Sequence, residues 1–296
     1  MKYSILGANG FLSTAIAKYC NVKGYELDIY GLEEPTIHRF DRFCKINLMN
    51  DTIDINQLLD SDVIVYSIGA GIQSNLKESY TMIYALNVTA PVNICNQLRV
   101  ANYQGKLITF GSVFEMGETY LRHPFAEEEV LTSNDKAPNE YTVSKRMLSR
   151  FVSSYGHEFT HWHFFIPTIY GEGENPKRLI PYVINSIRNN EELHFTDGDQ
   201  VRQYIYVGEI PKIIDECVIN NVPSGVYNLE GNETLTIKEI VNLIHATFGK
   251  VVPEGCFGTA QRTDVGMRYL ALDGAKLRSF LCFSISSDIA SISKLY

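Results

Sequence analysis

The stretch KYSILGANGFLS, residues 2–13, decides the fold class of this 296-residue chain. A short apolar run leads to Gly7, and Gly10 stands just before a helical pattern that ends at Gly24. A strand, a glycine turn and a helix in this order are typical of the start of a dinucleotide-binding unit. Gly7 permits the tight turn, and Gly10 lets the backbone approach a pyrophosphate at the helix N-terminus. We therefore predict a dinucleotide cofactor here, the alternative being a plain tight turn.

Segments typical of strands and of helices alternate through the first two-thirds of the chain. The apolar run SDVIVYSIG, residues 61–69, and the run THWHFFIPTIYG, residues 160–171, are typical of strands in a covered sheet. The alternation predicts an α/β protein with a Rossmann-like doubly wound parallel sheet. Beyond it, short segments rich in turn residues predominate. We expect a dinucleotide-binding Rossmann domain with the catalytic residues at 1–170. A smaller C-terminal substrate-binding lobe, not necessarily contiguous, is expected at 171–296.

Composition narrows the class of protein. The net charge is −8 with acids and bases interspersed, which argues against a nucleic-acid surface. No run approaches the roughly 20 apolar residues of a membrane span, and the early glycine turn leaves no room for a signal peptide. Six scattered cysteines without C-x-x-C spacing indicate thiols in a reducing compartment. We expect a cytoplasmic protein that binds neither nucleic acid nor membrane.

Three residues together suggest redox chemistry. Tyr141 and Lys145, in NEYTVSKRML, share one face of a predicted helix because they are one turn apart. By themselves they suit a core tyrosine beside a surface lysine equally well. Ser112 ends a predicted strand, where chemistry gathers in parallel sheets. With a nicotinamide to carry hydride, the set suits carbonyl–alcohol interconversion. Lys145 would lower the phenol pKa, Tyr141 would pass the proton, and Ser112 would hydrogen-bond the same oxygen.

With these motifs the sequence resembles the extended short-chain dehydrogenase/reductase family, in the branch that modifies nucleotide-linked sugars. GANGFLS resembles its G-x-x-G-x-x-G turn, KINLMN its G-D-L segment and YSIGAG its H-x-A-A strand end. LNVTAP is similar to N-x-x-G-T, GSVFEMG to S-S-x-x-V-Y-G, and YTVSK to Y-x-x-x-K. FIPTIYGEG is similar to R-x-x-N-V-Y-G-P-G, and VRQYIYVGEI to R-D-F-I-x-V-D-D. The resemblance covers nearly the whole chain.

The resemblance implies roles for individual residues. The implied catalytic residues are Ser112, Tyr141 and Lys145. The implied cofactor contacts are Gly7, Gly10, Phe11, Leu12, Asn47, Leu48, Ile68, Gly69, Asn87, Lys145 and Pro167. The implied contacts to a nucleotide-diphosphate sugar are Thr168, Asn175, Arg202, Tyr204 and Arg262. The two arginines of that set would meet the substrate diphosphate.

The residues after Ser112 bear on the reaction. In the 4,6-dehydratases of the resembled family, Asp-Glu follows the active-site threonine and supplies the acid and base. Here Val113 and Phe114 follow Ser112, and Glu115 comes one position later. Hydrocarbon cannot carry protons, so we favour NAD(P)H-dependent reduction of a nucleotide-linked 4-keto-6-deoxyhexose, which would supply a 6-deoxyhexose for a surface polysaccharide. The alternatives are an NAD-dependent C4 epimerase and a non-catalytic cofactor-binding sensor.

Several departures from the family pattern concern the cofactor, and Asn47 in place of the adenine-binding aspartate is one of them. Ser13 replaces the third glycine of the turn. The second predicted strand ends at Gly31, where a carboxylate would bind the ribose of NAD. Leu32 follows, where an arginine would favour a 2′-phosphate. Because glycine removes a charge that would repel phosphate, we expect a slight preference for NADP(H) over NAD(H).

Two other features support only modest expectations. The histidines of HWH, residues 161–163, fall on one face of a predicted strand. No third ligand is apparent nearby, so we predict a structural role and no metal. The helical segments NQLRVAN and RMLSRFVSSY could form a homodimer interface, although apolar faces equally suit a monomer core.

Overall fold

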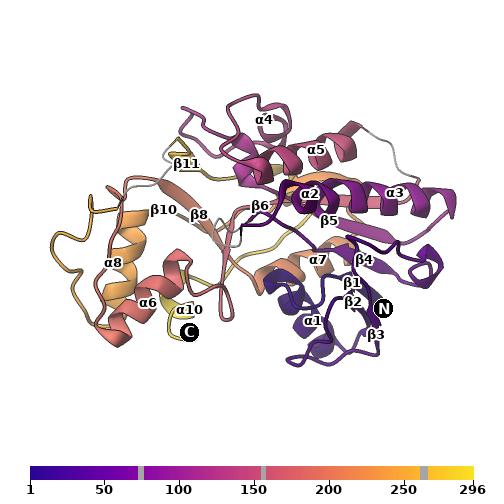
Figure 1. Ribbon diagram of the computed structural model, residues 1–296, viewed down its shortest axis with the longest axis horizontal. Helices are drawn as coiled ribbons and strands as arrows, with labels where there is room; N and C mark the ends of the chain where they lie inside the picture. Colours follow the sequence, from indigo (N-terminus) through magenta and orange to yellow (C-terminus); the bar gives the residue numbers. More distant parts are fainter. Residues whose placement is uncertain (73–76, 155–157, 261–265) are drawn as a thin grey trace.

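The computed structural model describes residues 1–72, 77–154, 158–260 and 266–296. A central sheet carries helices on both faces, and a smaller lobe lies beside it (Figure 1). All neighbouring strands of the sheet are parallel. In spatial order the strands are β3 (Arg42–Lys45), β2 (Glu26–Gly31), β1 (Lys2–Leu6), β4 (Val63–Tyr66), β5 (Lys106–Ser112), β6 (Thr160–Ile166) and β9 (Gly225–Asn228). This order confirms the predicted Rossmann-like doubly wound sheet.

Ten α-helices are present in the described parts of the chain. They are α1 (Phe11–Lys23), α2 (Tyr80–Tyr84), α3 (Ala90–Val100), α4 (Glu127–Thr132), α5 (Glu140–Ser154), α6 (Leu179–Asn189), α7 (Glu209–Ile219), α8 (Ile237–Thr247), α9 (Ala275–Arg278) and α10 (Ile289–Ile292). Helices α1 and α7 cover one face of the central sheet, and α3 and α5 cover the other (Figure 1). Within the described ranges, no helix is both long and apolar enough to span a bilayer.

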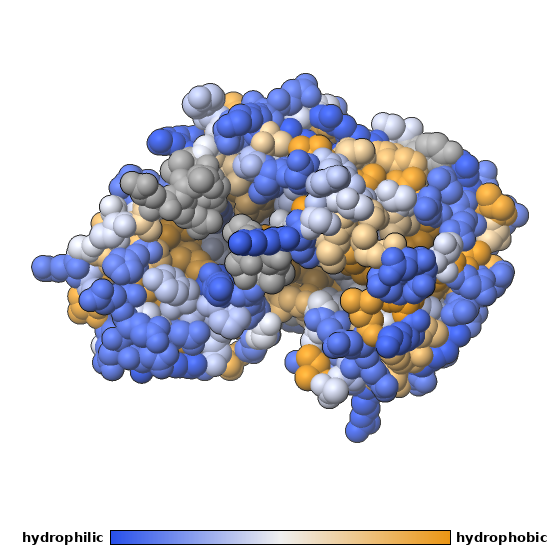
Figure 2. All heavy atoms as spheres, viewed as in Figure 1, coloured by the Kyte–Doolittle hydropathy of each residue, from blue (hydrophilic) through white to orange (hydrophobic). Residues whose placement is uncertain are grey.

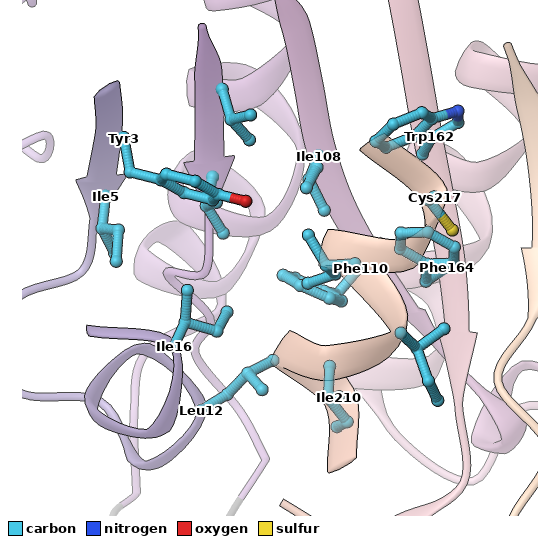
Figure 3. Close-up of a cluster of buried hydrophobic side chains, with 14 of the residues drawn as sticks. Tyr3, Ile5, Leu12, Ile16, Ile108, Phe110, Trp162, Phe164, Ile210 and Cys217 are labelled. Atoms are coloured by element: carbon cyan, nitrogen blue, oxygen red, sulfur yellow. The ribbon is translucent and has the colours of Figure 1, made fainter. Parts of the chain in front are cut away.

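The period-two pattern of each strand explains the two cores. In β4, Val63 and Val65 pack with α1 and α7, whereas Ile64 and Tyr66 pack with α3. Side chains of β1, β5, β6, α1 and α7 meet in the first of these cores (Figure 3). A strand buried on both faces has no polar side, which is why these runs are continuously apolar.

The smaller lobe is built on a second sheet. Its strands are β7 (Thr168–Tyr170), β8 (Val201–Tyr206), β10 (Glu233–Thr236) and β11 (Tyr269–Leu270). Helices α6, α8 and α10 contribute to a separate apolar core against this sheet. Helix α8 begins at a capping box in which Thr236 and Glu239 satisfy each other's backbone N–H groups.

The single strand expected at residues 160–171 is wrong. Pro167 separates β6, which pairs with β5 and β9, from β7, which pairs with β8 in the other sheet. Proline has no N–H to continue a ladder, so the chain leaves one sheet and enters the next here. The chain beyond residue 171 contributes both to the smaller lobe and to the central sheet, because α7 packs on the central sheet and β9 joins it.

Candidate active site

A cleft of about 1280 Å³ lies between the carboxyl ends of the central strands and the smaller lobe. Figure 2 shows a hollow between the lobe that bears α6 and α8 and the layer that bears α1. The structure brings most of the expected site residues to this cleft. They are Gly7, Gly10, Phe11, Leu12, Asn47, Leu48, Ile68, Gly69, Ser112, Tyr141, Lys145, Pro167, Thr168, Asn175, Arg202 and Tyr204.

The other two expected residues are Arg262 and Asn87. Arg262 lies outside the described residues. Asn87 does not line the cleft: it is fully buried, and its side-chain amide accepts from the N–H and donates to the carbonyl of Ala70, both at 2.9 Å. Its Nδ2 also donates to Ser144 Oγ at 2.9 Å. Asn87 therefore joins the loop after β4 to α5 from behind the cleft wall.

The glycine turn is shaped by close backbone packing. Gly7 has φ +120°, and its N–H donates to the Tyr30 carbonyl at 2.9 Å. Gly10 is the N-cap of α1. Ser13 is tolerated at the third glycine position because its hydroxyl turns inward and donates to the Gly10 carbonyl at 2.9 Å. The first turn of α1 holds no acidic residue, so its N-terminus suits an anion such as a pyrophosphate.

Gly31 has a packing explanation that the sequence did not reveal. A Cβ added at Gly31 would lie 2.6 Å from Ala8 Cβ and 3.0 Å from the Ala8 nitrogen. The end of β2 thus presses on the glycine turn and leaves no room for a side chain. Glu33, two positions later, lines the cleft instead.

Ser112, Tyr141 and Lys145 meet at the end of β5. Ser112 is its last residue, and Tyr141 and Lys145 are buried residues of α5. Lys145 Nζ donates to the Phe110 carbonyl at 2.7 Å and lies 5.9 Å from the Tyr141 ring centroid. The side chains of Tyr141 and Ser112 hydrogen-bond each other. The trio can therefore bind one carbonyl or hydroxyl oxygen from two sides.

The pKa of Tyr141 is raised in the protein by itself, so the lowering expected from Lys145 does not decide its net direction. Burial raises the Tyr141 pKa to about 12, and the nearby Glu115 carboxylate adds to the rise, while the bond with Ser112 and the charge of Arg178 oppose it. Burial also lowers the pKa of Lys145 to about 8, against the opposing charge of Glu115. Desolvation is the largest cause of both shifts because both groups are buried. Tyr141 therefore keeps its proton at neutral pH, as a proton donor must.

Cleft residues that the sequence motifs did not reveal include Lys177 and Arg178, which precede α6. Arg178 Nε lies 3.2 Å from Glu174 Oε2. Cations are unfavourable at a helix N-terminus, so a basic pair just before an amphipathic helix was a signal available in the sequence. Together with Arg202 these cations make the lobe side of the cleft suitable for an anionic ligand.

The two histidines of β6 do lie on one face, as predicted. Thr109 Oγ lies 2.8 Å from His161 Nε2 and 2.7 Å from His163 Nδ1. His163 Nε2 lies 2.9 Å from Ser149 Oγ on α5. These contacts make both histidines part of the buried polar layer under the active site. Across the described ranges, no group of three or more His, Cys, Asp or Glu residues could hold a metal ion.

Comparison with known proteins identifies a family over most of the chain. The model of the NAD dependent epimerase/dehydratase family matches residues 3–229. CDP-abequose synthase of Salmonella muenchen is 22% identical over 258 residues, which cover 82% of this chain and 79% of that protein.

Solved structures share the fold. UDP-glucose 4-epimerase of Thermus thermophilus, in complex with NAD, has a TM-score of 0.81 at 16% identity and covers 100% of this chain and 97% of its own. The dTDP-glucose 4,6-dehydratase of Bacillus anthracis, in complex with NAD, has a TM-score of 0.80 at 18% identity, with coverage of 99% and 96%.

Proposed function

The chain belongs to the NAD dependent epimerase/dehydratase family, and from this premise we propose that it reduces a nucleotide-linked 4-keto-6-deoxyhexose with NAD(P)H. One observation carries the proposal: Ser112, Tyr141 and Lys145 share a single cleft with the glycine turn of α1. When bound, the reduced nicotinamide supplies hydride. The residues that would hold the dinucleotide are Gly7, Gly10, Phe11, Leu12, Asn47, Leu48, Ile68, Gly69 and Pro167.

The chemistry of the protein side follows from the pKa of Tyr141. Its buried phenol is protonated at neutral pH, so it can donate to the ketone oxygen while Ser112 hydrogen-bonds the same atom. As the proton leaves, the ammonium of Lys145 and the bond from Ser112 stabilise the developing phenolate. Reduction thus starts from the protonation state that the fold already favours.

Elimination of water is not part of the proposal, because no acid stands where a dehydratase needs one. Val113 is buried in the apolar core with Phe114 packed against it. Glu115 is fully buried and its Oε1 accepts from the Ser112 N–H at 2.8 Å, which fixes it away from the cleft. Hydrocarbon at the first two positions leaves ketone reduction or epimerisation.

The substrate class is proposed from charge. Lys177, Arg178 and Arg202 line the lobe side of the cleft, away from the glycine turn. Such cations suit the diphosphate of a nucleotide sugar. The relative from Salmonella muenchen is named for a CDP-linked sugar, so CDP-linked substrates are the first to test.

The expected slight preference for NADP(H) gains no support from the cleft. Glu33 lies beside Gly31 in the lining, and a carboxylate there would repel a 2′-phosphate. The lysines and arginines among the described lining residues are Lys145, Lys177, Arg178 and Arg202. None of these comes from the β2 or β3 side, where the adenosine would lie. We therefore propose that NAD(H) binds at least as tightly as NADP(H).

Replacing Gly31 with aspartate, the residue that a family pattern would suggest for NAD, is expected to weaken both cofactors about tenfold or more. Its Cβ would meet Ala8 at 2.6 Å, and overpacking of this kind costs about 1–3 kcal/mol. Fluorescence titration with NADH and NADPH measures both Kd values. The matched control is Leu32→Asp at the next, exposed position, which adds the charge without the clash and weakens NADPH more than NADH. Unchanged NADH binding by Gly31→Asp would contradict the packing explanation.

The decisive experiment follows the near-ultraviolet absorbance of NADH or NADPH with purified protein and a panel of 4-keto-6-deoxy sugar nucleotides. Stoichiometric loss of the signal with one substrate is the expected result. No loss, with tightly bound NAD released on denaturation, would point to the C4 epimerase. No loss and no bound cofactor would favour a protein that has kept the fold without the chemistry.

Homodimerisation stays a prediction. Val100 of α3 and Val143 and Met147 of α5 are exposed, so the two expected helices do present apolar side chains. Sedimentation analysis of the parent and of Met147→Glu tests this, with a dimer that dissociates in the variant as the expected result.

A further inference from the structure

Glu115 is a buried acid for which the proposed reaction has no use. It is fully buried, and it stands where the motif S-S-x-x-V-Y-G, matched here by GSVFEMG, has valine. Its Oε1 accepts from the Ser112 N–H at 2.8 Å and closes a capping box. Its Oε2 is buried without a hydrogen-bond partner among the described residues. Burial raises the pKa of Glu115 to about 7, against the hydrogen bonds and the positive charges of Lys145 and Arg146 that oppose the rise. The ionised carboxylate therefore depends on a compensating charge.

The carboxylate lies against the backbone of β5. A Cβ added at Gly111 would lie 2.7 Å from Glu115 Oε1 and 2.7 Å from His163 Nε2. Glycine at this position therefore leaves the space that the acid and the imidazole share. The acid reaches the layer directly beneath Ser112 because Gly111 has no side chain.

Hydrogen bonds in this layer indicate that His163 is neutral. The Ser149 hydroxyl donates to the Lys145 carbonyl at 3.0 Å, so it accepts from His163 Nε2–H. His163 Nδ1 then accepts from the Thr109 hydroxyl, which in turn accepts from His161 Nε2–H. Burial keeps the pKa of His163 near 3, so the imidazole cannot balance the carboxylate.

The positive charges of two α5 residues, Lys145 and Arg146, act on Glu115, and only Lys145 belongs to the proposed catalytic trio. Lys145 Nζ and Glu115 Oε1 both bind the backbone at the end of β5, at Phe110 O and Ser112 N. Arg146 is engaged with carbonyl oxygens: its Nε donates to Glu115 O at 2.6 Å, its Nη1 to Asp135 O at 2.8 Å and its Nη2 to Met116 O at 3.0 Å. Lys145 has an ammonium with three donors, of which one is directed to Phe110 O at 2.7 Å. Lys145 is thus the cation whose charge depends most on its surroundings.

We propose that Glu115 is a positioning residue of the active site, which holds the Ser112 backbone in place and keeps Lys145 charged by acting as its buried counter-ion. The proposal rests on the proposed function for its catalytic consequence, but the charge pairing itself does not depend on turnover. The direction of the effect follows from electrostatics. Burial lowers the pKa of Lys145 to about 8 and Glu115 opposes this fall, so removal of the carboxylate would lower that pKa further.

The test removes the charge and keeps the shape. Glu115→Gln retains an oxygen for the Ser112 N–H but carries no charge. Lys145 is expected to lose its proton at a pH about one unit lower than in the parent, a tenfold change in its proton affinity. The readout is the pH dependence of acetylation of Lys145 by trace acetic anhydride, followed by mass spectrometry of its peptide. The matched control is Glu118→Gln, whose carboxylate pairs with the exposed Lys136, and its midpoint should equal that of the parent.

The pH profile of kcat provides the second readout. A group with a lowered pKa keeps its proton only at lower pH, so the alkaline limb of kcat should move to lower pH by the same amount, with KM unchanged. Glu115→Val, the residue of the motif, also removes the bond to Ser112 and should lower kcat at every pH. If Glu115→Gln does not fold, the same labelling of Lys145 is measured in Glu115→Val.

An unchanged labelling midpoint for Lys145 in a folded variant without the charge would overturn the proposal. Because labelling needs neither substrate nor cofactor, its outcome is separate from that of the proposed function. A shifted midpoint in a protein that reduces no sugar nucleotide would support the pairing and refute the reaction.

Discussion

Tyr141→Phe is expected to lower kcat for ketone reduction by about 10²–10⁴-fold, because it removes the group that donates the proton. The substitution deletes one oxygen from a buried ring of α5 and keeps the packing of the aromatic face. The Kd of the dinucleotide should therefore change by no more than about twofold. This is a small change in binding free energy, since a tenfold change in Kd corresponds to about 1.4 kcal/mol. Stopped-flow single turnover and fluorescence titration measure the two effects separately.

The control for this variant is Tyr80→Phe. Tyr80 is 70% exposed and begins α2, so its hydroxyl should be dispensable for turnover. Residual activity of Tyr141→Phe within tenfold of the parent would show that another group donates the proton. Equal losses of kcat and of cofactor binding would instead mean that the ring oxygen has a structural role.

Trp162→Ala is expected to lower the free energy of unfolding by about 3–5 kcal/mol, the usual cost of deleting a large core aromatic. Trp162 is fully buried in β6 and points into the core formed with α7 (Figure 3). Its Nε1–H donates to the carbonyls of Val222 and Pro223, each at 3.1 Å. Its loss therefore leaves a cavity and removes the donor to two carbonyl oxygens. Urea denaturation followed by circular dichroism measures the effect.

Two further variants separate the causes. Trp162→Phe keeps much of the ring volume but loses the N–H donor, so its cost should be smaller, at about 1–3 kcal/mol. Val251→Ala, at a position that is 90% exposed, should stay within about 0.5 kcal/mol of the parent. A loss below about 1 kcal/mol for Trp162→Ala would mean that the core between β6 and α7 collapses to fill the cavity.

The fold could be predicted from the sequence because its signals are local. The glycine turn, the apolar runs and the Tyr141–Lys145 spacing each need only a few neighbouring residues to be interpreted. They predicted the sheet and the helix that carries Tyr141 and Lys145. The prediction of a single strand at residues 160–171 failed because the apolar pattern continues through Pro167, whereas the central sheet ends there. An apolar pattern indicates that residues are buried. It does not indicate in which of the two sheets they are buried, so it could not show the break.

Predictions of site details failed where those details depend on packing between segments that are distant in the sequence. Asn87 looks like a cofactor contact in its motif, yet its amide binds the backbone of Ala70. Gly31 looked like an electrostatic signature, yet the backbone and Cβ of Ala8 explain it. Neither neighbour is identifiable until the strands are paired, since contact distances are a property of the assembled sheet.

By itself, the sequence determined the parallel sheet and the glycine turn, because each follows from residue type and short spacing. It also predicted a site of Ser112, Tyr141 and Lys145. Only the tertiary structure decided the electrostatics of that trio. It buried Tyr141 deeply enough to raise its pKa to about 12, placed Glu115 beneath Ser112 and brought Arg178 into the same cleft. The physical reason is that a pKa depends on desolvation and on every charge within reach in space, whereas a motif records only neighbours along the chain.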